Sequence, residues 1–331
     1  MASPGQGYSA GAFNVFSELV TTTHRAHLKE ISDNVSNHNA LYGKLTKSGK
    51  IRMIDSGISI ATPLEYAVNS TYQRYSGFDI LSTAAVDVIT AAEFPWRNVN
   101  VSLAISGSEI RINRGENQII DLVKAKLNNA RHSMANGLST DFYSDGTLTN
   151  QVNGIQALVA DTGTGTVGGI SSSQYDFWQN VVQSAAAPLG GGSAIVPSAS
   201  TIESLMLPLW IRLVRGIDRP DLIVMSDDYF TFYETSQSTL KRYTADESGK
   251  GGMSAMKYKG VDVIFDSSGG IPSSHAYFLN TNYLGVTVHP DANMSISDDN
   301  KSINQDAMVK NILWQGNLTV SNRARQGVLK A

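Results

Sequence analysis

The apolar and polar positions of residues 71–112 predict a long two-stranded hairpin. Its first arm, residues 71–81, carries two tyrosines, a phenylalanine and aliphatic side chains, and its second arm, residues 96–105, alternates apolar and polar residues as a half-buried strand does. An isolated two-stranded hairpin is only marginally stable in water, and its open edges pair readily with other chains. We therefore expect another subunit to cover this insertion, which indicates assembly rather than catalysis.

The strongest helical pattern begins directly after the insertion. Asn113 and Glu116 have the spacing of a capping box and predict a helix start, and Asn136 followed by Gly137 predicts its end. About 20 residues at a rise of about 1.5 Å make a helix about 30 Å long. One apolar stripe, in steps of three and four residues, is expected to be the core of this spine helix: Ile119, Val123, Leu127, Ala130 and Met134.

The flanking segments mix helices with strands, so the pattern predicts an α+β protein. Residues 13–41 predict an N-terminal helix, and residues 82–94 a loop or short helix at the hairpin tip. A capping box at residues 200–203 predicts a helix kinked at Pro208, and the acids at 227–228 predict the first turn of another helix. Strands are expected at residues 222–226, 260–265, 276–279, 284–289 and 309–321, and a loop at 244–256.

Composition narrows the class of protein. The chain has 331 residues, which is more than one hydrophobic core usually organises, so we expect two subdomains. Its net charge is −3 and it has no run of lysines or arginines, which disfavours a basic arm that neutralises phosphates. The absence of cysteine excludes disulfides and thiolate metal sites and fits a reducing cytoplasm. We expect neither a membrane span nor a secretory signal, because no suitable apolar run occurs.

One glycine-rich motif imitates a dinucleotide-binding site. Gly163, Gly165 and Gly168 fit the G-x-G-x-x-G pattern. Such a site needs a helix that begins at the third glycine and an acidic residue about 20 positions further on. Residues 169–173 intervene before any helix, and residues 188–193 hold no acid. The pattern therefore indicates a flexible loop.

Histidine and acid pairs offer little for catalysis. His24 and His27 share one face of a predicted helix, but a third metal ligand is hard to nominate in a chain without cysteine. The acid pairs at 227–228 and 298–299 are adjacent in sequence, whereas general acid–base catalysis needs carboxylates that converge from separate places. We therefore predict no catalytic, cofactor-binding or metal-binding residues, no cofactor and no enzyme activity.

The aromatic insertion could also imitate a platform for single-stranded nucleic acid. Arg74, Arg97 and Arg111 would be its cations. Four acids of the same region balance them: Asp79, Asp87, Glu93 and Glu109. Because the protein is acidic overall, the sequence disfavours this interpretation.

The order of an N-terminal arm, a protruding hairpin, a long helix, a mixed α/β region and a closing strand resembles the major capsid proteins of tailed bacteriophages, which have the Hong Kong 97 fold. The resemblance covers nearly the whole chain and consists of arrangement and texture rather than a catalytic signature. The segments that carry it are residues 72–77, 94–97, 105–107, 114–116, 144–146, 154–161, 314–318 and 322–323.

The resemblance implies a division of the chain. Residues 1–55 would be an N-terminal arm, 56–70 a bridge into the peripheral domain, 71–112 the extended β-hairpin loop, 113–149 the spine helix and peripheral domain, 150–305 the axial α/β domain, and 306–331 a C-terminal strand that returns to the peripheral domain. The extended loop would lie over a neighbouring subunit. Its expected contact residues are Tyr72, Arg74, Tyr75, Phe78, Phe94, Trp96 and Arg97.

The resemblance also implies partners. The chain would assemble with itself as hexamers and pentamers into an icosahedral shell in the host cytoplasm, and would end in the virion around double-stranded DNA that it does not read by sequence. A separate scaffolding protein, a portal protein and a cement or decoration protein are the expected partners. An encapsulin-type compartment shell is an alternative with the same fold. A secreted β-rich protein that binds or hydrolyses glycans is a second alternative, from another class.

Overall fold

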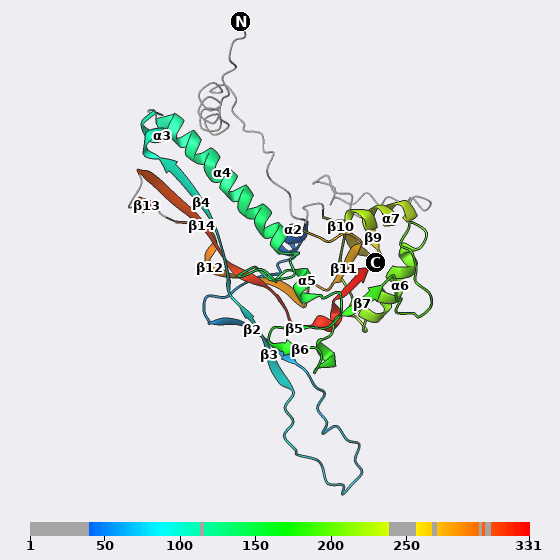
Figure 1. Ribbon diagram of the computed structural model, residues 1–331. Helices are drawn as coiled ribbons and strands as arrows, with labels where there is room; N and C mark the ends of the chain where they lie inside the picture. The colour runs from blue at the N-terminus through cyan, green and yellow to red at the C-terminus, as the bar shows by residue number, and fades with distance from the viewer. Residues whose placement is uncertain (1–39, 113–115, 238–255, 267–269, 298–299, 302–305) are drawn as a thin grey trace. The chain divides into compact units, whose positions relative to one another are not determined.

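The computed structural model describes residues 40–112, 116–237, 256–266, 270–297, 300–301 and 306–331 (Figure 1). The chain forms two compact units. Among the described residues, the smaller unit contains 101–133 and 297–312, and the larger unit contains the rest. The N-terminal helix predicted for residues 13–41 lies outside the described residues, except that Ala40 and Leu41 begin helix α2 (Ala40–Lys47).

A six-stranded mixed sheet organises the larger unit. β15 runs parallel to β7 and antiparallel to β11, while β8 runs antiparallel to β11 and parallel to β10. All four side chains of β8 are buried, as expected for a continuous apolar run in a sheet covered on both faces. In order across the sheet, the strands are β7 (Val181–Ser184), β15 (Gly327–Lys330), β11 (His275–Leu279), β8 (Leu222–Met225), β10 (Val261–Phe265) and β9 (Met256–Tyr258).

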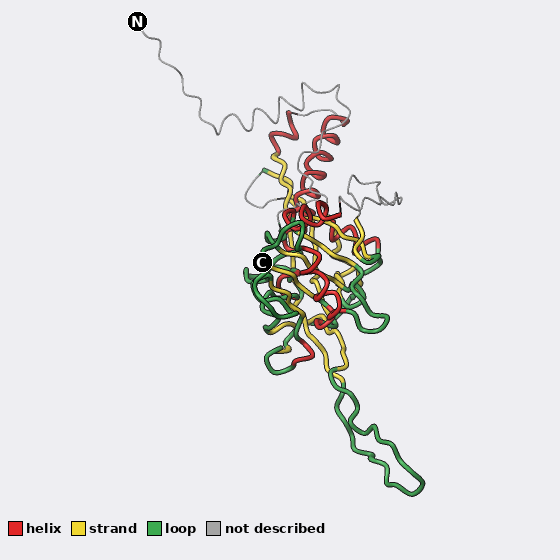
Figure 2. The backbone as a smooth tube through the Cα atoms, turned by 90° about the vertical axis from the view of Figure 1, so that its right-hand side faces the viewer, coloured by secondary structure: helices red, strands yellow, loops and turns green. Residues whose placement is uncertain are grey.

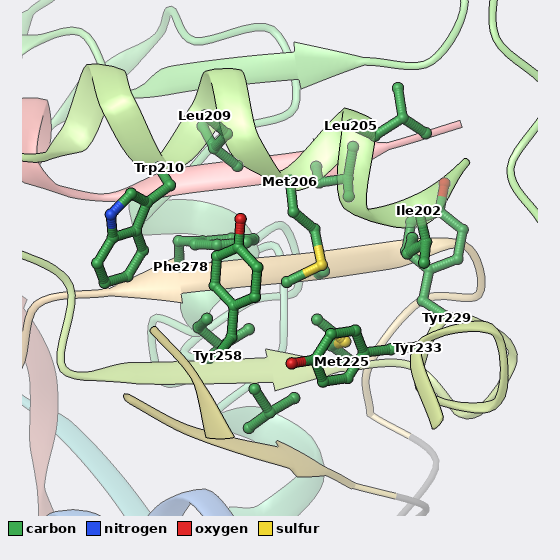
Figure 3. Close-up of a cluster of buried hydrophobic side chains, with 14 of the residues drawn as sticks. Ile202, Leu205, Met206, Leu209, Trp210, Met225, Tyr229, Tyr233, Tyr258 and Phe278 are labelled. Atoms are coloured by element: carbon green, nitrogen blue, oxygen red, sulfur yellow. The ribbon is translucent and has the colours of Figure 1, made fainter. Parts of the chain in front are cut away.

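Two helices bury an apolar stripe against this sheet (Figure 3). Helix α7 (Asp227–Gln237) begins with two acids, as predicted, and adds Tyr229 and Tyr233 to the cluster. Residues of helix α6 (Ile202–Leu213) recur in steps of one and three, so that they share one helical face. The buried members of that face are Ile202, Leu205, Met206, Leu209, Trp210 and Leu213.

Helix α6 begins one residue later than the predicted capping box implies. Thr201 precedes its first turn, but no side-chain cap is formed there. The Thr201 hydroxyl instead donates to the carbonyl oxygen of Val196 at 2.7 Å. Pro208 lies inside the helix, which continues to Leu213 because buried side chains on both sides of the proline hold it against the sheet.

A second sheet contains five strands. β1 (Ile51–Met53) runs parallel to β12 (Leu284–Ile296), and β12 lies next to β14 (Ala307–Val320). β13 (Asn300–Lys301) and β4 (Arg97–Ser106) both pair with β14. β12 contains the strand predicted at residues 284–289, and β14 contains all but the last residue of the strand predicted at 309–321, so both strands are confirmed.

The predicted pairing of the insertion arms was wrong. Residues 71–81 form no strand, and β4 pairs with β14 instead. The hairpin is made by shorter strands, β2 (Ser59–Glu65) and β3 (Ile89–Pro95). The alternation in β4 reports that one of its faces is buried, and such a pattern does not identify the strand that pairs with it.

The spine helix is longer than predicted. After α3 (Gly107–Ile112), helix α4 runs over Glu116–Asp141 and passes through Gly137, where the sequence predicted its end. Leu138 is buried four residues after Met134, so packing of the next turn outweighs the low helix propensity of glycine. Ala130 and Met134 are buried and Leu127 is partly buried. Asn113 and the side chains of Ile119 and Val123 lie outside the described residues.

The end of the chain also differs from the expectation. After β14, the short helix η4 (Arg323–Arg325) leads into β15, which joins the six-stranded sheet between β7 and β11. Residues 306–331 thus contribute to both large sheets rather than forming a single returning strand. None of the described helices is both long enough and apolar enough to cross a membrane.

The burial along α6 generates a test with a matched control. We expect Leu209→Ala, at a fully buried position, to lower the free energy of unfolding of the unassembled subunit by about 2–5 kcal/mol, because it leaves a cavity. Leu207→Ala in the same helix, at a 41% exposed position, should cost less than about 1 kcal/mol. Urea unfolding measures both values, and equal losses would contradict the packing described for α6.

Candidate assembly surface

In the structure the protruding insertion spans residues 59–95, and a short antiparallel ladder closes its base. β2 and β3 pair from Ser59 opposite Pro95 to Glu65 opposite Ile89. One further hydrogen bond, from Tyr66 N to the carbonyl oxygen of residue 88, continues the ladder at 3.0 Å. The buried side chains alternate along both strands, and they are Ile60, Thr62, Leu64, Ala92 and Phe94. The ladder fixes where the remaining residues, 67–87, extend from the packed part of the larger unit; we call these residues the insertion loop.

The insertion loop exposes most of its large apolar side chains. Phe78 has 105% of its reference exposure and Ile80 has 94%. The complete exposed set is Val68, Tyr72, Tyr75, Phe78, Ile80 and Leu81. Figure 2 shows the loop extending from the paired ends of β2 and β3 without strands of its own. Such a concentration of exposed apolar surface marks an interaction site in a soluble protein.

Polar contacts within the loop shape its tip. Ser76 N donates to Asp79 Oδ2 at 2.7 Å, and Asp79 N donates to the Ser76 carbonyl oxygen at 3.1 Å. Gly77 has a φ of +51°, a conformation that glycine adopts without strain. Gln73 Nε2 donates to the carbonyl oxygen of Ile80 at 3.1 Å, across this turn. The turn therefore presents Phe78 outward, with its side chain fully exposed.

Four of the seven predicted contact residues are exposed on the insertion loop: Tyr72, Arg74, Tyr75 and Phe78. Phe94 is fully buried within its own subunit, so the prediction that it contacts a neighbour was wrong. Its side chain points to the same face of β3 as Ala92, two residues earlier, and both lie on the buried face. The sequence could not reveal which face of β3 the larger unit covers.

Trp96 and Arg97 are partly buried beside the base of the insertion. Trp96 Nε1 donates to the Gly57 carbonyl oxygen at 2.9 Å, and its ring meets the His289 ring edge-on with 6.0 Å between centroids. Arg97 Nη1 donates to Asn150 Oδ1 at 3.5 Å. These contacts hold both side chains to their own subunit, and their contact with a neighbour stays a prediction.

Val68, Ile80 and Leu81 are exposed on the same loop, although none of them was predicted as a contact residue. The sequence signal that could have identified them as contact residues is their apolar character. Ile80 and Leu81 lie in a predicted strand, where an aliphatic side chain is ordinarily assigned to the core, and the absence of a strand at residues 71–81 leaves them exposed.

The glycine motif does not form a dinucleotide site. Strand β5 (Thr166–Val167) and strand β6 (Ile170–Ser171) make a tight hairpin around Gly168 and Gly169. Both glycines have positive φ, +59° and +76°, as a two-residue type I′ turn requires. A strand rather than a helix start follows Gly168, so no helix dipole faces the turn. The segment is an ordered hairpin where the sequence predicted a flexible loop.

The acids of helix α7 are structural. Asp227 is exposed, whereas Asp228 is partly buried and accepts hydrogen bonds from the hydroxyls of Ser226 and Ser274, the latter at 2.7 Å. Burial raises the pKa of Asp228, but these hydrogen bonds and those from backbone N–H groups outweigh burial and lower it overall. The two carboxylates therefore do not converge as an acid–base pair.

The described residues offer little evidence of a site for a metal ion or for nucleic acid. Within the described part of the chain, no group of three histidine, cysteine or acidic side chains could hold a metal ion. His24, His27 and residues 298–299 lie outside the described residues. Of the three arginines considered for nucleic acid, Arg74 is exposed, Arg97 bonds Asn150, and the side chain of Arg111 is not described.

No known family model and no curated protein sequence matches the chain, but several solved structures are similar to it. The capsid of cyanophage A-1(L) is 16% identical with a TM-score of 0.64 over 95% of this chain and 98% of that one. The capsid of Myoviridae phage XM1 is 12% identical with a TM-score of 0.56 over 99% and 100%.

An encapsulin has a similar fold. The SrpI encapsulin of Synechococcus elongatus PCC 7942 is 11% identical with a TM-score of 0.59 over 98% of this chain and 96% of that one. These identities establish the fold alone. The α+β arrangement predicted from the order of elements is thereby confirmed: the chain has the Hong Kong 97-type fold of tailed-phage major capsid proteins.

Proposed function

We propose that this chain is the major capsid protein of a tailed phage and assembles as hexamers and pentamers into an icosahedral shell around double-stranded DNA. The observation that carries the proposal is the exposed apolar surface of the insertion loop. A neighbouring subunit would cover it. The fold shared with phage capsids supports the same function, and the role is structural rather than enzymatic.

The energetics of the loop support assembly. Its six exposed apolar side chains are too far from their own core to be buried, and burying one such side chain is worth about 1.5–3 kcal/mol. The two aromatic side chains nearest the tip, Tyr75 and Phe78, are of the kind that dominates binding energy at interfaces. Each shell contains many copies of the contact, so modest pairwise energies sum to a stable particle.

The division of the chain follows from the proposed function. Residues 1–55 would be the N-terminal arm, 113–149 the spine helix with the peripheral domain, and 150–305 the axial domain around the shell's symmetry axes. Partners would be a scaffolding protein and a portal protein during assembly in the host cytoplasm, with a cement or decoration protein on the finished virion. The net charge of −3 fits a shell filled by a motor rather than one condensed around its genome.

An encapsulin-like compartment is the second candidate, because the SrpI encapsulin shares the fold over nearly the whole chain. The two functions differ in what assembly needs. Expression of the chain alone and with the neighbouring genes of its own genome, followed by electron microscopy, separates them. Closed shells that require a scaffolding gene and acquire a portal support the phage capsid. Complete shells from the chain alone, filled with a cargo enzyme, would support the compartment.

Deletion of the insertion loop tests the proposed surface. A short Gly/Ser link can replace residues 67–87, because the hydrogen bond from Tyr66 N to the residue 88 carbonyl already brings the ends together. We expect the subunit to keep its thermal unfolding midpoint within about 3 °C, since loop-closure cost changes slowly with length. Sedimentation should detect no shells. Normal shells from the deletion variant, or failure of the subunit to fold, would contradict the assignment.

A single substitution tests whether Phe78, at the tip of the insertion loop, contacts a neighbouring subunit. Phe78→Ala should weaken each contact between subunits by about 2 kcal/mol, because it removes an aromatic anchor. The unassembled subunit should be unaffected, because Phe78 is fully exposed there. Ser82→Ala, in the same loop, is the control and should change shell stability by less than about 0.5 kcal/mol. Guanidinium dissociation of shells measures the difference, and equal midpoints for the two variants would exclude Phe78 as an anchor.

A further inference from the structure

The larger unit holds the base of the insertion at two places. On β3, Glu93 N donates to the carbonyl oxygen of Gly168 at 3.0 Å. A Cβ atom placed on Gly168 would lie 2.8 Å from Ala92 Cβ and 3.1 Å from Phe94 Cζ, so the turn of the β5–β6 hairpin rests directly on the buried face of β3. Only a glycine permits this approach without displacing the strand.

The second place is at the end of β2. Tyr66, the residue that follows β2, contacts Phe177 with 6.0 Å between ring centroids. Phe177 belongs to the short helix η1 (Asp176–Trp178), which lies a few residues after the β5–β6 hairpin. One continuous segment, residues 163–178, therefore contacts β3 and the residue that follows β2, and we call this segment the buttress.

The buttress is itself anchored to the six-stranded sheet. Trp178 is buried, and its Nε1 donates to the Val167 carbonyl oxygen at 2.9 Å, which joins η1 to the hairpin. Arg323 Nη1 donates to the Trp178 carbonyl oxygen at 3.0 Å, and Arg323 Nη2 donates to Asn180 Oδ1 at 2.9 Å. Arg323 lies four residues before β15, so this chain of contacts runs from the sheet to the insertion.

Arg323 is well suited to this position. Its guanidinium is fully buried, and Nε donates to the Leu158 carbonyl oxygen at 2.7 Å. Burial lowers the pKa of Arg323 to about 10, which still leaves the group charged near neutral pH. A buried charge with fixed acceptors tolerates little displacement, because each lost hydrogen bond leaves the charge uncompensated.

We infer that the buttress sets the direction in which the insertion leaves the larger unit, with Gly168 as the positioning residue on β3 and Arg323 as the anchor. The inference deepens the proposed function and rests on it for its consequence in assembly: a loop aimed by its own subunit reaches the correct patch of a second copy of this chain. The contacts themselves lie within one subunit, so they can be tested without a shell.

The chain offers a matched pair of substitutions. Gly168 and Gly169 are adjacent in one turn and both have positive φ, so alanine strains the backbone at either position. Gly168 abuts β3, whereas a Cβ atom on Gly169 meets nothing within 4 Å. A difference between Gly168→Ala and Gly169→Ala therefore reports the contact with β3 rather than the strain of the turn.

The measurement is a distance within the unassembled subunit. The chain has no cysteine, so Thr83→Cys in the insertion loop and Arg212→Cys on α6 create two unique sites for nitroxide labels. Both positions are exposed. Pulsed electron paramagnetic resonance on the full chain then gives the distribution of distances between them. Gly169→Ala should leave the distribution unchanged. Gly168→Ala should shift its mean by on the order of 2 Å or more, because a displacement at the base is amplified along about ten extended residues.

Phe177→Ala is a second variant that introduces no backbone strain. Removing this ring withdraws the support at Tyr66, so we expect a broader distribution with the subunit still folded. Unchanged distributions for both Gly168→Ala and Phe177→Ala would overturn the inference. The proposed function is tested separately. If the original chain with its scaffolding gene makes no shells while the distances shift as described, the result supports the role of the buttress and contradicts the capsid function.

Discussion

The structure depends on a constraint at the insertion loop: its large exposed apolar side chains do not reach a core of their own subunit. The ladder of β2 and β3 ends at Tyr66, and the insertion loop beyond it forms no strand that could pack against the larger unit. Burial of such side chains is the dominant favourable term in protein association. The free subunit consequently exposes an apolar surface at residues 67–87.

The base of the insertion and the insertion loop differ in how far their side chains are buried. At the base, alternate side chains of β2 and β3 are buried, and the β5–β6 turn approaches β3 closely enough that only glycine fits. In the middle, local hydrogen bonds such as those between Ser76 and Asp79 shape short turns and leave the side chains outside. The base is thus packed within its own subunit, whereas the loop leaves its large apolar side chains exposed.

Much of the fold follows from local pattern in the sequence. The continuous apolar run of β8 and the acids that open α7 each identified an element, because each is fixed by neighbours along the chain. The failures concern long-range choices. β4 pairs with β14 rather than with residues 71–81, and α4 passes through Gly137 because Leu138 has a place in the core. Phe94 was misassigned because the element that covers it is distant in sequence.

The proposed assembly requires that the insertion loop be exposed in the free subunit and covered by a neighbour in the shell. Amide hydrogen exchange of both states tests it most directly. In the free subunit, most amides of residues 67–87 should exchange within seconds while those of β8 stay protected, because the loop has few backbone hydrogen bonds. Assembly should slow the loop at least about tenfold and leave β8 unchanged. Exchange in the loop that is equally fast in both states would contradict the account.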